Sequence, residues 1–356
     1  MVVRRLLLMS VPALQLPLPC APEAIDDFLS QPQEGTLQLL DSVHSDILVL
    51  GVGGKMGLHL CRMLREGLRR LGKANTIYAA SRFRTLASRE AYEAHGIETL
   101  VGDFEDPAFL ESLPECPVVF FLVGAKFGTA GQPELLQRIN VEVPGRVAER
   151  FASSRIVAFS TGCVYAYTSP ESGGSTEASP TAPVGAYAES CLGREEAFGR
   201  VSAARRTPVV LIRLNYSVEF RYGVPVDIAS RVLRGEPVDV SMGYVNVIWQ
   251  NDALNQIVQC LRLAQSPPVP INITGPEIVA VRDLAQRFGK LFGREPILTG
   301  EEAPTAWLSN AARSHQLFGR PSVSLDRMIE WIAAWLVREG STYNKPTGFE
   351  RRDGRF

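Results

Sequence analysis

The fold of this chain is decided by the stretch DILVLGVGGKMG, residues 46–57. Its first half is a short apolar run that ends in glycine, which is typical of a buried parallel strand. Its second half carries Gly51, Gly54 and Gly57, and the residues that follow place leucines on one stripe, as an amphipathic helix does. The stretch therefore predicts a strand, a tight glycine turn and a helix.

The same alternation of strand and helix continues along the chain. Helical patterns separate further apolar runs, and this spacing predicts an α/β fold with a Rossmann-type doubly wound parallel sheet. After about residue 215 the pattern loosens, which predicts a smaller C-terminal α/β region. The predicted strands are residues 46–50, 76–80, 97–101, 118–123, 155–159 and 209–212 in the sheet, and 238–240 and 271–273 in the C-terminal region.

The glycine spacing predicts a site for the diphosphate of a dinucleotide. Gly51 would permit the tight turn, Gly54 would let the backbone approach a pyrophosphate, and Gly57 would let the helix pack against the strand. The helix N-terminus adds free N–H groups and a partial positive charge. A purely structural glycine turn is the alternative. The candidate cofactor-binding residues of this turn are Gly51, Gly53, Gly54, Lys55, Met56 and Gly57.

The end of the second predicted strand favours NADP(H) over NAD(H). An NAD site usually has an acidic residue there that accepts hydrogen bonds from the ribose 2′-hydroxyl. Ser81 and Arg82 occupy that place and could hold a 2′-phosphate, because arginine offers a planar fork of donors. A solvated surface arginine is the alternative. Asp103, followed by Phe104, could bond the adenine amino group or cap the next helix.

Composition excludes several classes of function. The chain has 356 residues and a net charge of −1, so no global field favours nucleic acid or an anionic membrane. Apolar runs are too short for a transmembrane span. The six cysteines form neither a C-x-x-C pair nor a zinc pattern, so we expect no metal site and reduced thiols in a cytoplasmic protein.

Both ends of the chain fall outside the predicted sheet. Arg4 and Arg5 before an apolar run imitate a secretory signal, but interrupting prolines favour an ordinary arm over an export signal. The Arg-rich tail is expected to be a surface strap or disordered. We expect an N-terminal arm at 1–44, a dinucleotide-binding domain at 45–215, a substrate-binding region at 216–340 that is interleaved with it, and a polar tail at 341–356.

Several further motifs follow the glycine turn in order. Gly124-Ala125-Lys126 comes after the fourth predicted strand, and Asn140 lies in the next helix. The segment 160–165 has the pattern S-[ST]-x-x-V-Y, and Tyr187 follows it. Together with the segments 213–216, 246–252 and 272–275, these motifs resemble the extended short-chain dehydrogenase/reductase family of NAD-dependent epimerases and dehydratases. The resemblance extends from about residue 46 to residue 336.

The resemblance implies roles for individual residues. In this family a tyrosine is the acid/base, a threonine or serine bonds the substrate oxygen, and hydride passes between the substrate carbon and nicotinamide C4. It implies a small-molecule substrate and a homodimer formed through the helices bearing Asn140 and Tyr187. The implied catalytic residues are Thr161 and Tyr187, the implied cofactor contacts are Val123, Gly124, Lys126 and Asn140, and the implied substrate contacts are Thr161, Cys163 and Asn215.

One catalytic position departs from the family. The residue four after Tyr187 is Cys191, where the family has lysine, and both side chains share one helix face. A lysine ammonium about 5 Å away would stabilise the phenolate by ~3 kcal/mol at an effective dielectric constant of about 20, or roughly two pKa units. A neutral cysteine thiol supplies no such charge.

Three hypotheses follow from this exchange. Tyr187 could still work, with oxidised cofactor or a nearby cation, Lys126 or Arg194, replacing the lost charge. The chain could instead bind dinucleotide without hydride chemistry, as a regulator or scaffold. Cys191 could itself be catalytic as a nucleophile, which the absence of a histidine nearby in sequence disfavours. We predict an NADP(H)-dependent oxidoreductase or epimerase that acts on a hydroxyl or keto carbon of a carbohydrate-like molecule.

Overall fold

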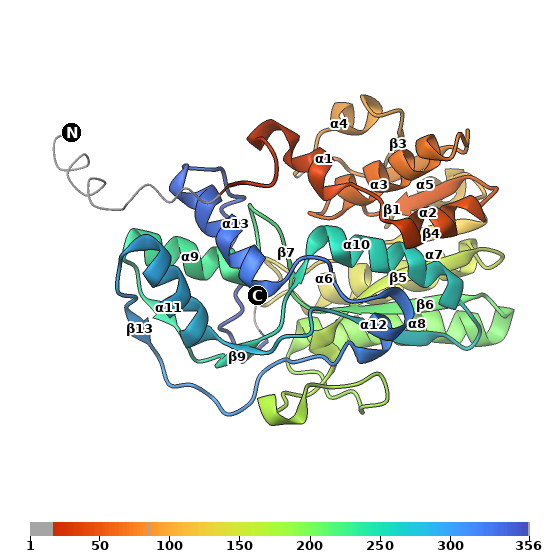
Figure 1. Ribbon diagram of the computed structural model, residues 1–356. Helices are drawn as coiled ribbons and strands as arrows, with labels where there is room; N and C mark the ends of the chain where they lie inside the picture. Colours follow the sequence, from red (N-terminus) through yellow and green to blue (C-terminus); the bar gives the residue numbers. More distant parts are fainter. Residues whose placement is uncertain (1–16, 85, 355–356) are drawn as a thin grey trace.

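The computed structural model describes residues 17–84 and 86–354. A twisted parallel sheet with helices on both faces forms one part of the molecule, and a smaller group of helices including α9, α11 and α13 lies beside it (Figure 1). The segment 1–16, on which the choice between an ordinary arm and an export signal depends, lies outside the described residues.

Seven strands form the main sheet in the described residues, and every neighbouring pair is parallel. Their order is β11-β6-β5-β4-β1-β2-β3, so the order reverses between β1 and β4. In open α/β sheets this switch point is where ligands bind, outside the carboxyl ends of the strands. The strands are β1 (Ile47–Leu50), β2 (Ile77–Ser81), β3 (Glu98–Val101), β4 (Val118–Phe121), β5 (Arg155–Thr161), β6 (Val209–Leu214) and β11 (Val269–Ile273).

Alternate residues of each strand face opposite layers of helices, because side chains along a strand point to opposite faces. In β1, Ile47 and Val49 pack in one apolar layer and Leu48 and Leu50 pack in the other. The first layer contains α2 (Glu34–Asp41), α3 (Gly57–Arg70), α4 (Arg89–Glu93) and α10 (Gln250–Gln259); the second contains α5 (Pro107–Ser112), α7 (Val143–Arg150) and α8 (Ala186–Arg205).

The C-terminal region has its own apolar core. Trp249 and Trp307 are buried in it, as their apolar surroundings require. Its helices are α9 (Val224–Arg234), α11 (Val281–Phe292) and α13 (Leu325–Val337). Three two-stranded ladders complete it: β7 (Ser217–Val218) with β10 (Ile248–Trp249), β8 (Val238–Asp239) with β13 (Leu298–Thr299), and β9 (Tyr244–Val245) with β12 (Val279–Ala280).

The remaining short elements connect these layers. α1 (Ile25–Leu29) follows a 3-10 turn at Pro22–Ala24 and packs near α3 and α10. α6 (Pro133–Gln137) runs into a π-helical turn at Arg138–Glu142, and α12 (Ala312–Phe318) precedes α13. Further 3-10 turns lie at Gly162–Val164, Pro170–Ser172 and Cys260–Leu263. No helix among the described residues is long and apolar enough to span a membrane.

The predicted α/β fold with a parallel Rossmann-type sheet is confirmed, with two differences in detail. β4 ends at Phe121, two residues earlier than predicted, because Leu122 and Val123 begin the loop beside the glycine turn. The run 271–273, assigned from sequence to the C-terminal region, instead belongs to β11 of the main sheet. β11 pairs with the outer edge of β6 and buries its isoleucines in the sheet's apolar layer.

The tail is an ordered strap in the residues that the structure describes. We call residues 341–354 the C-terminal strap; after α13 it returns toward the middle of the molecule (Figure 1). Thr347 and Phe349 are buried, and Phe349 joins the core of the C-terminal region. The sequence left a surface strap and a disordered tail open, and its polar composition gave no sign that Thr347 and Phe349 are buried.

Candidate active site

The glycine turn needs glycine at two positions for different reasons. Gly51 has φ of +82°, and a Cβ there would lie 2.5 Å from the backbone nitrogen of Val123. A Cβ on Gly57 would lie 2.1 Å from the carbonyl oxygen of Val52, so close packing of α3 on β1 excludes any side chain. Gly54 differs, because a Cβ there would meet nothing within 4 Å. The turn thus exposes bare backbone next to a helix N-terminus, which suits a diphosphate.

The end of β2 presents a cation beside a carboxylate. Arg82 is exposed, and its Nη1 lies 3.4 Å from Oδ2 of Asp103. Oδ1 of Asp103 accepts a hydrogen bond from the backbone N–H of Glu105 at 3.0 Å. Ser81 is buried, and its hydroxyl accepts a hydrogen bond from the backbone N–H of Phe83 at 3.4 Å. The guanidinium is therefore available at the edge of the turn, paired with Asp103.

Asn140 fixes the loop that follows β4. Its Oδ1 accepts from the backbone N–H of Ala125 at 2.8 Å, and its Nδ2 donates to the Ala125 carbonyl at 2.9 Å and to Oγ of Ser190 at 2.9 Å. The side chain is fully buried. Asn140 therefore positions the loop, and a direct contact between Asn140 and the cofactor stays a prediction. The side chain of Phe104 also contacts protein groups, because it is buried and packs against the ring of Phe109.

Tyr187 and Cys191 lie one turn apart on α8 and share a side-chain hydrogen bond. Cys191 is fully buried and packs with Val164 and Tyr165. Thr161 ends β5 on the adjoining wall, where its Oγ1 accepts from the backbone N–H of Cys163 at 3.1 Å. The three predicted catalytic side chains thus lie on two adjacent elements, β5 and α8.

Burial controls protonation in this cluster. It raises the pKa of the Tyr187 phenol well above its ordinary value, and the neighbouring thiols of Cys191 and Cys163 raise it further. Burial also raises the pKa of Cys191. Tyr187 is therefore a neutral phenol and Cys191 a neutral thiol at physiological pH. A protonated, buried thiol is a poor nucleophile, which removes support from a covalent role for Cys191.

Two basic side chains lie near Tyr187, one from the loop after β4 and one from α8 itself. The Nζ of Lys126 lies 5.3 Å from the Tyr187 ring centroid, and Cys163 and Cys191 are its electrostatic neighbours. Arg194 is buried on α8, where it donates to the Phe159 carbonyl at 3.0 Å and to Oδ1 of Asn140 at 2.8 Å. Its charge lowers the pKa of Tyr187, against the larger effect of burial. Arg194 therefore supplies positive charge near Tyr187, although not from position 191.

Asn215 holds the segment after β13 over the ends of β5 and β6. Its Nδ2 donates to Oδ1 of Asn246 at 2.8 Å and to the Trp307 carbonyl at 3.2 Å. Asn246 in turn donates from Nδ2 to the Ser309 carbonyl at 2.6 Å. The amide nitrogen of Asn215 is thus engaged within the protein, which leaves less of this side chain for the substrate than the sequence suggested.

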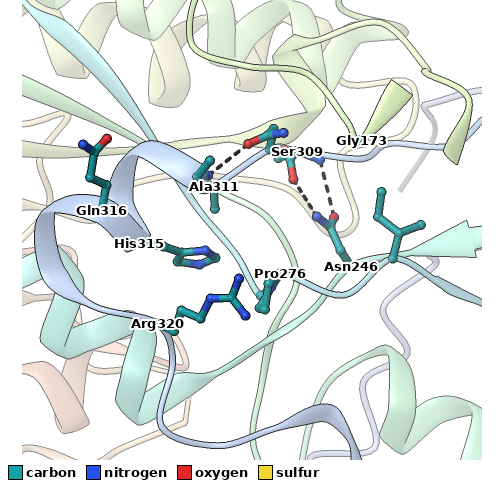
Figure 2. A pocket seen from close by; sticks show the side chains of 12 residues that line it. Gly173, Asn246, Pro276, Ser309, Ala311, His315, Gln316 and Arg320 are labelled. Atoms are coloured by element: carbon teal, nitrogen blue, oxygen red, sulfur yellow. Dashed lines mark hydrogen bonds between the residues drawn. The ribbon is translucent and has the colours of Figure 1, made fainter. Parts of the chain in front are cut away.

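A cavity of about 430 Å³ lies beside Asn246 (Figure 2). His315 and Arg320 contribute its basic groups, and Ser309 and Asn246 line it as well. Nε2 of His315 lies 3.0 Å from the Thr274 carbonyl and donates to it, which fixes the ring. The cavity opens beside the carboxyl end of β11, apart from Tyr187.

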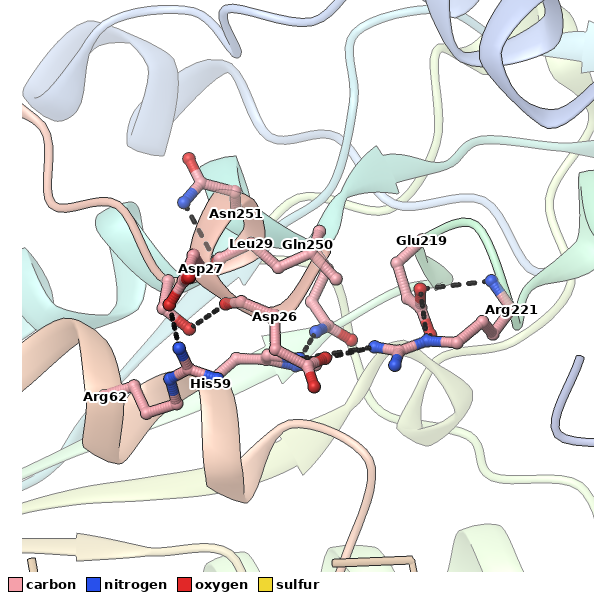
Figure 3. Close-up of polar contacts among 10 residues, drawn as sticks. Asp26, Asp27, Leu29, His59, Arg62, Glu219, Arg221, Gln250 and Asn251 are labelled. Carbon is pink, nitrogen blue, oxygen red and sulfur yellow. Dashed lines mark hydrogen bonds and ion pairs between the residues drawn. The ribbon is translucent and has the colours of Figure 1, made fainter. Parts of the chain in front are cut away.

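A polar network joins the N-terminal arm to both parts of the molecule (Figure 3). Gln250 donates from Nε2 to Nδ1 of His59 at 2.7 Å, so Nε2 of His59 carries the hydrogen and donates to Asp26 at 2.9 Å. Arg221 also donates to Asp26 at 2.8 Å and pairs with Glu219 at 3.1 Å. His59 and Arg221 hold the pKa of Asp26 far below its usual range. This network anchors the first turns of α3.

Comparison with known proteins identifies the family. Residues 47–235, just over half of the chain, match the family model described as "NAD dependent epimerase/dehydratase family". The chain belongs to this family. Membership confirms the predicted short-chain dehydrogenase/reductase-type enzyme. No curated protein sequence matches the chain significantly.

Solved structures share the fold at low sequence identity. MoeE5 in complex with UDP-glucuronic acid and NAD is 19% identical with a TM-score of 0.67, covering 83% of this chain and 99% of that one. A UDP-glucose 4-epimerase from Thermus thermophilus in complex with NAD is 18% identical with a TM-score of 0.68, covering 82% and 99%. The Bordetella bronchiseptica enzyme WbmG in complex with NAD and UDP is 20% identical with a TM-score of 0.68, covering 86% and 99%.

Within this epimerase/dehydratase framework, Lys345 carried no signal in the sequence, because only the long-range folding of the C-terminal strap brings it to the site. Two residues that the motifs did contain have contacts that motif spacing could not reveal. Tyr216, from the segment 213–216, has φ of +43° and is an electrostatic neighbour of Cys163. The Nζ of Lys55, a predicted cofactor contact of the glycine turn, lies 3.2 Å from the ring centroid of Tyr222.

Proposed function

We propose that this chain is a nicotinamide-dinucleotide-dependent oxidoreductase or epimerase that acts on a hydroxyl or keto carbon of a carbohydrate-like substrate. The observation that carries the proposal is the approach of Lys126 to the ring of Tyr187 on α8, a helix that packs against β5, the strand that ends at Thr161. All three lie at the carboxyl ends of the strands, on the side of the sheet where the glycine turn begins α3.

Thr161 is placed to orient the substrate oxygen. Because its Oγ1 already accepts the Cys163 N–H, its own hydroxyl hydrogen is left to donate to a substrate carbonyl or hydroxyl. A bound nicotinamide would supply hydride transfer at the adjoining carbon. Tyr187 would give a proton to the substrate oxygen during reduction and take it back during oxidation.

Lys126 would supply the positive charge that Cys191 lacks. Its ammonium lies 5.3 Å from the Tyr187 ring centroid, on the side of the tyrosine that faces the β4 loop. A unit charge at about this distance is worth ~3 kcal/mol at an effective dielectric constant of about 20. In its charged form Lys126 would therefore offset part of the effect of burial on the pKa of Tyr187.

The end of β2 and the similar structures suggest the cofactor and substrate classes. β2 ends in Ser81 and is followed by Arg82 rather than by an acidic residue, which favours NADP(H) over NAD(H), while Asp103, which pairs with Arg82, follows β3. The similar structures named above contain NAD, which is the alternative to test. One of them also contains UDP-glucuronic acid and another UDP, which suggests a nucleotide-linked sugar as the substrate. A homodimer formed through the helices around Asn140 and Tyr187, and a cytoplasmic location, remain predictions from the sequence.

The proposal is tested by mixing purified protein with NADH, NADPH, NAD⁺ or NADP⁺ and a panel of nucleotide-linked sugars, free sugars and keto acids. Tyr187→Phe should reduce any detected turnover by about a thousandfold while leaving dinucleotide affinity unchanged, because it removes only the transferred proton. Tight dinucleotide binding without turnover across the panel would favour the non-catalytic regulator. Calorimetry that detects no binding of any pyridine dinucleotide would refute both.

A further inference from the structure

Three lysine side chains from distant segments converge on one aromatic ring. Lys55 belongs to the glycine turn, Lys126 to the loop after β4 and Lys345 to the C-terminal strap. Their Nζ atoms lie 5.1, 5.3 and 4.4 Å from the ring centroid of Phe127. Three lysine amino groups are therefore gathered around a single side chain, and one of them belongs to the turn that precedes α3.

Bringing the three lysines together disfavours their charged forms. Burial lowers the pKa of Lys55 to about 6, and repulsion from Lys126 and Lys345 contributes to the shift. Burial also lowers the pKa values of Lys126 and Lys345. The ring faces of Tyr222 and Phe127 favour the ammonium form of Lys55, but they do not outweigh burial.

The carboxylates that face Lys55 are engaged elsewhere. Asp227 and Glu219 both act on Lys55 electrostatically. Oδ2 of Asp227 accepts from the backbone N–H and the hydroxyl of Thr347, each at 2.7 Å. Glu219 pairs with Arg221 at 3.1 Å. Both carboxylates near Lys55 are therefore already engaged by other groups, and an added anion would offset the repulsion that Lys55 experiences.

The strap holds Lys345 in place from both sides. The backbone N–H of Tyr343 donates to the Arg221 carbonyl at 3.1 Å, and Thr347 is bonded to Asp227. Farther along, Phe349 is buried in the C-terminal core. Arg352 donates to the side chain of Thr305 at 2.9 Å, and its carbonyl accepts from the Tyr167 hydroxyl at 2.8 Å. Lys345 thus lies in a segment that is held by hydrogen bonds on both sides.

We propose that Lys55 and Lys345, with Lys126 between them and Tyr187, bind the diphosphate group of a nucleotide ligand, so that the C-terminal strap is part of the ligand site. A diphosphate provides several charged acceptor oxygens, and these match clustered ammonium donors beside a helix N-terminus. The inference rests on the proposed function for the identity of the ligand. The diphosphate could belong to the dinucleotide or to a nucleotide-linked sugar, and titration distinguishes these sources.

The experiment measures binding of NADPH, NADH, UDP and inorganic pyrophosphate to the full-length protein by calorimetry, at low and moderate salt. Lys345→Met should weaken at least one of these ligands by about tenfold at low salt and reduce the salt dependence of binding. Lys345→Arg should retain most of the affinity. Lys290→Met is the matched control, because Lys290 is an exposed lysine of α11. Melting temperatures of all variants check that the strap remains folded.

The pattern of losses identifies the source of the diphosphate. If Lys345→Met loses affinity only for NADPH and NADH, the lysines bind the diphosphate of the dinucleotide. If it loses affinity only for UDP, they bind the diphosphate of the substrate. Either result supports the site. Equal affinity of wild type and Lys345→Met for all four ligands overturns it. If no dinucleotide binds but UDP or pyrophosphate binding depends on Lys345, the proposed function fails while the diphosphate site stands.

Proton release or uptake gives a second readout. Because Lys55 is mostly neutral at about pH 7.5 in the free protein, a bound diphosphate should raise its pKa and draw in a proton. Titrations in buffers of different protonation enthalpy measure this uptake, and Lys55→Met should abolish it. Binding with no proton uptake by the wild type would contradict a contact between Lys55 and the diphosphate.

Discussion

The glycine turn and the face of α8 that carries Tyr187 provide charge in different ways, one through the backbone and the other through side chains. Both must place charge next to a bound nucleotide. The turn does so with backbone groups, and its shape depends on contacts that neighbouring residues make, such as Gly57 with Val52. The α8 face lacks the charge one turn after Tyr187; Arg194 on the same helix lowers the pKa of Tyr187, and we propose that Lys126 from the loop after β4 also contributes. The backbone groups of the turn are fixed by the local sequence, whereas a charge carried by a side chain can be supplied by a residue at another position.

The sharpest test of the backbone side of this comparison is a pair of glycine substitutions. Gly57→Ala should destabilise the fold by about 3 kcal/mol, because its Cβ meets the Val52 carbonyl at 2.1 Å. Gly54→Ala should change stability by less than about 1 kcal/mol, since its Cβ has open space, yet it should weaken dinucleotide binding. Denaturant unfolding and calorimetry measure the two effects. Equal stabilities would mean that the turn is not held as tightly as described.

The charge on the α8 face is tested by removing Lys126. Lys126→Met should lower kcat about a hundredfold in the direction of oxidation, and should shift the pH profile upward by roughly two units. The sign follows from electrostatics: without the nearby ammonium the tyrosine loses its proton only at higher pH. Steady-state kinetics between about pH 6 and 10 measure the shift. An unchanged profile would leave the role of replacement cation to Arg194 or to the oxidised cofactor.

A double variant asks whether the charge has moved from α8 to the β4 loop. Cys191→Lys alone should shift the pH profile that reports Tyr187 to lower pH. It should raise activity by no more than about tenfold, because Lys126 already lies near the tyrosine. In the Lys126→Met background the same change should restore most of the lost activity. Additive effects in a double-mutant cycle would show that the two positions act independently. Cys191→Ala, which adds no charge, is the control.

The smallest expected effect concerns cofactor choice at the end of β2. Arg82→Ala should weaken NADPH by about tenfold and NADH hardly at all, because only NADPH offers a 2′-phosphate to the guanidinium. Arg69→Ala, which removes an exposed arginine of α3 that pairs with Glu66, serves as the control. Equal losses for both dinucleotides would exclude the 2′-phosphate role and point to NAD(H).

The sequence predicted the main architecture because its signals are local. Six apolar runs, the glycine turn and the leucine stripe of α3 each depend on neighbours within a few residues, and the structure contains all of them. The assignment of 271–273 to the C-terminal region was wrong because its run is short, and only pairing with β6 determines its sheet. The burial of Phe349 likewise depends on a core that forms far from it in sequence.

The candidate site shows the same limit. The resemblance located Tyr187, Thr161 and Lys126, since each stands in a fixed motif. It could not reveal that Asn140 is satisfied by Ala125 and Ser190, because those partners lie 15 and 50 residues away. Lys345 belongs to no motif, and only the folding of the strap brings it to Phe127. Motifs thus identify residues, while their partners depend on tertiary contacts.

The strap affects how fast a ligand can enter and leave the site. Its Lys345 lies over Phe127, and its residues 353–354 lie close to Gly185, just before α8. A bound nucleotide would therefore be covered by the strap. We expect dissociation to be slow as a result. A dehydrogenase must replace its cofactor after every turnover, whereas isomerisation that takes a hydride and returns it to the same molecule needs no replacement. Slow exchange would therefore penalise net oxidation or reduction far more than redox-neutral inversion of a carbon centre.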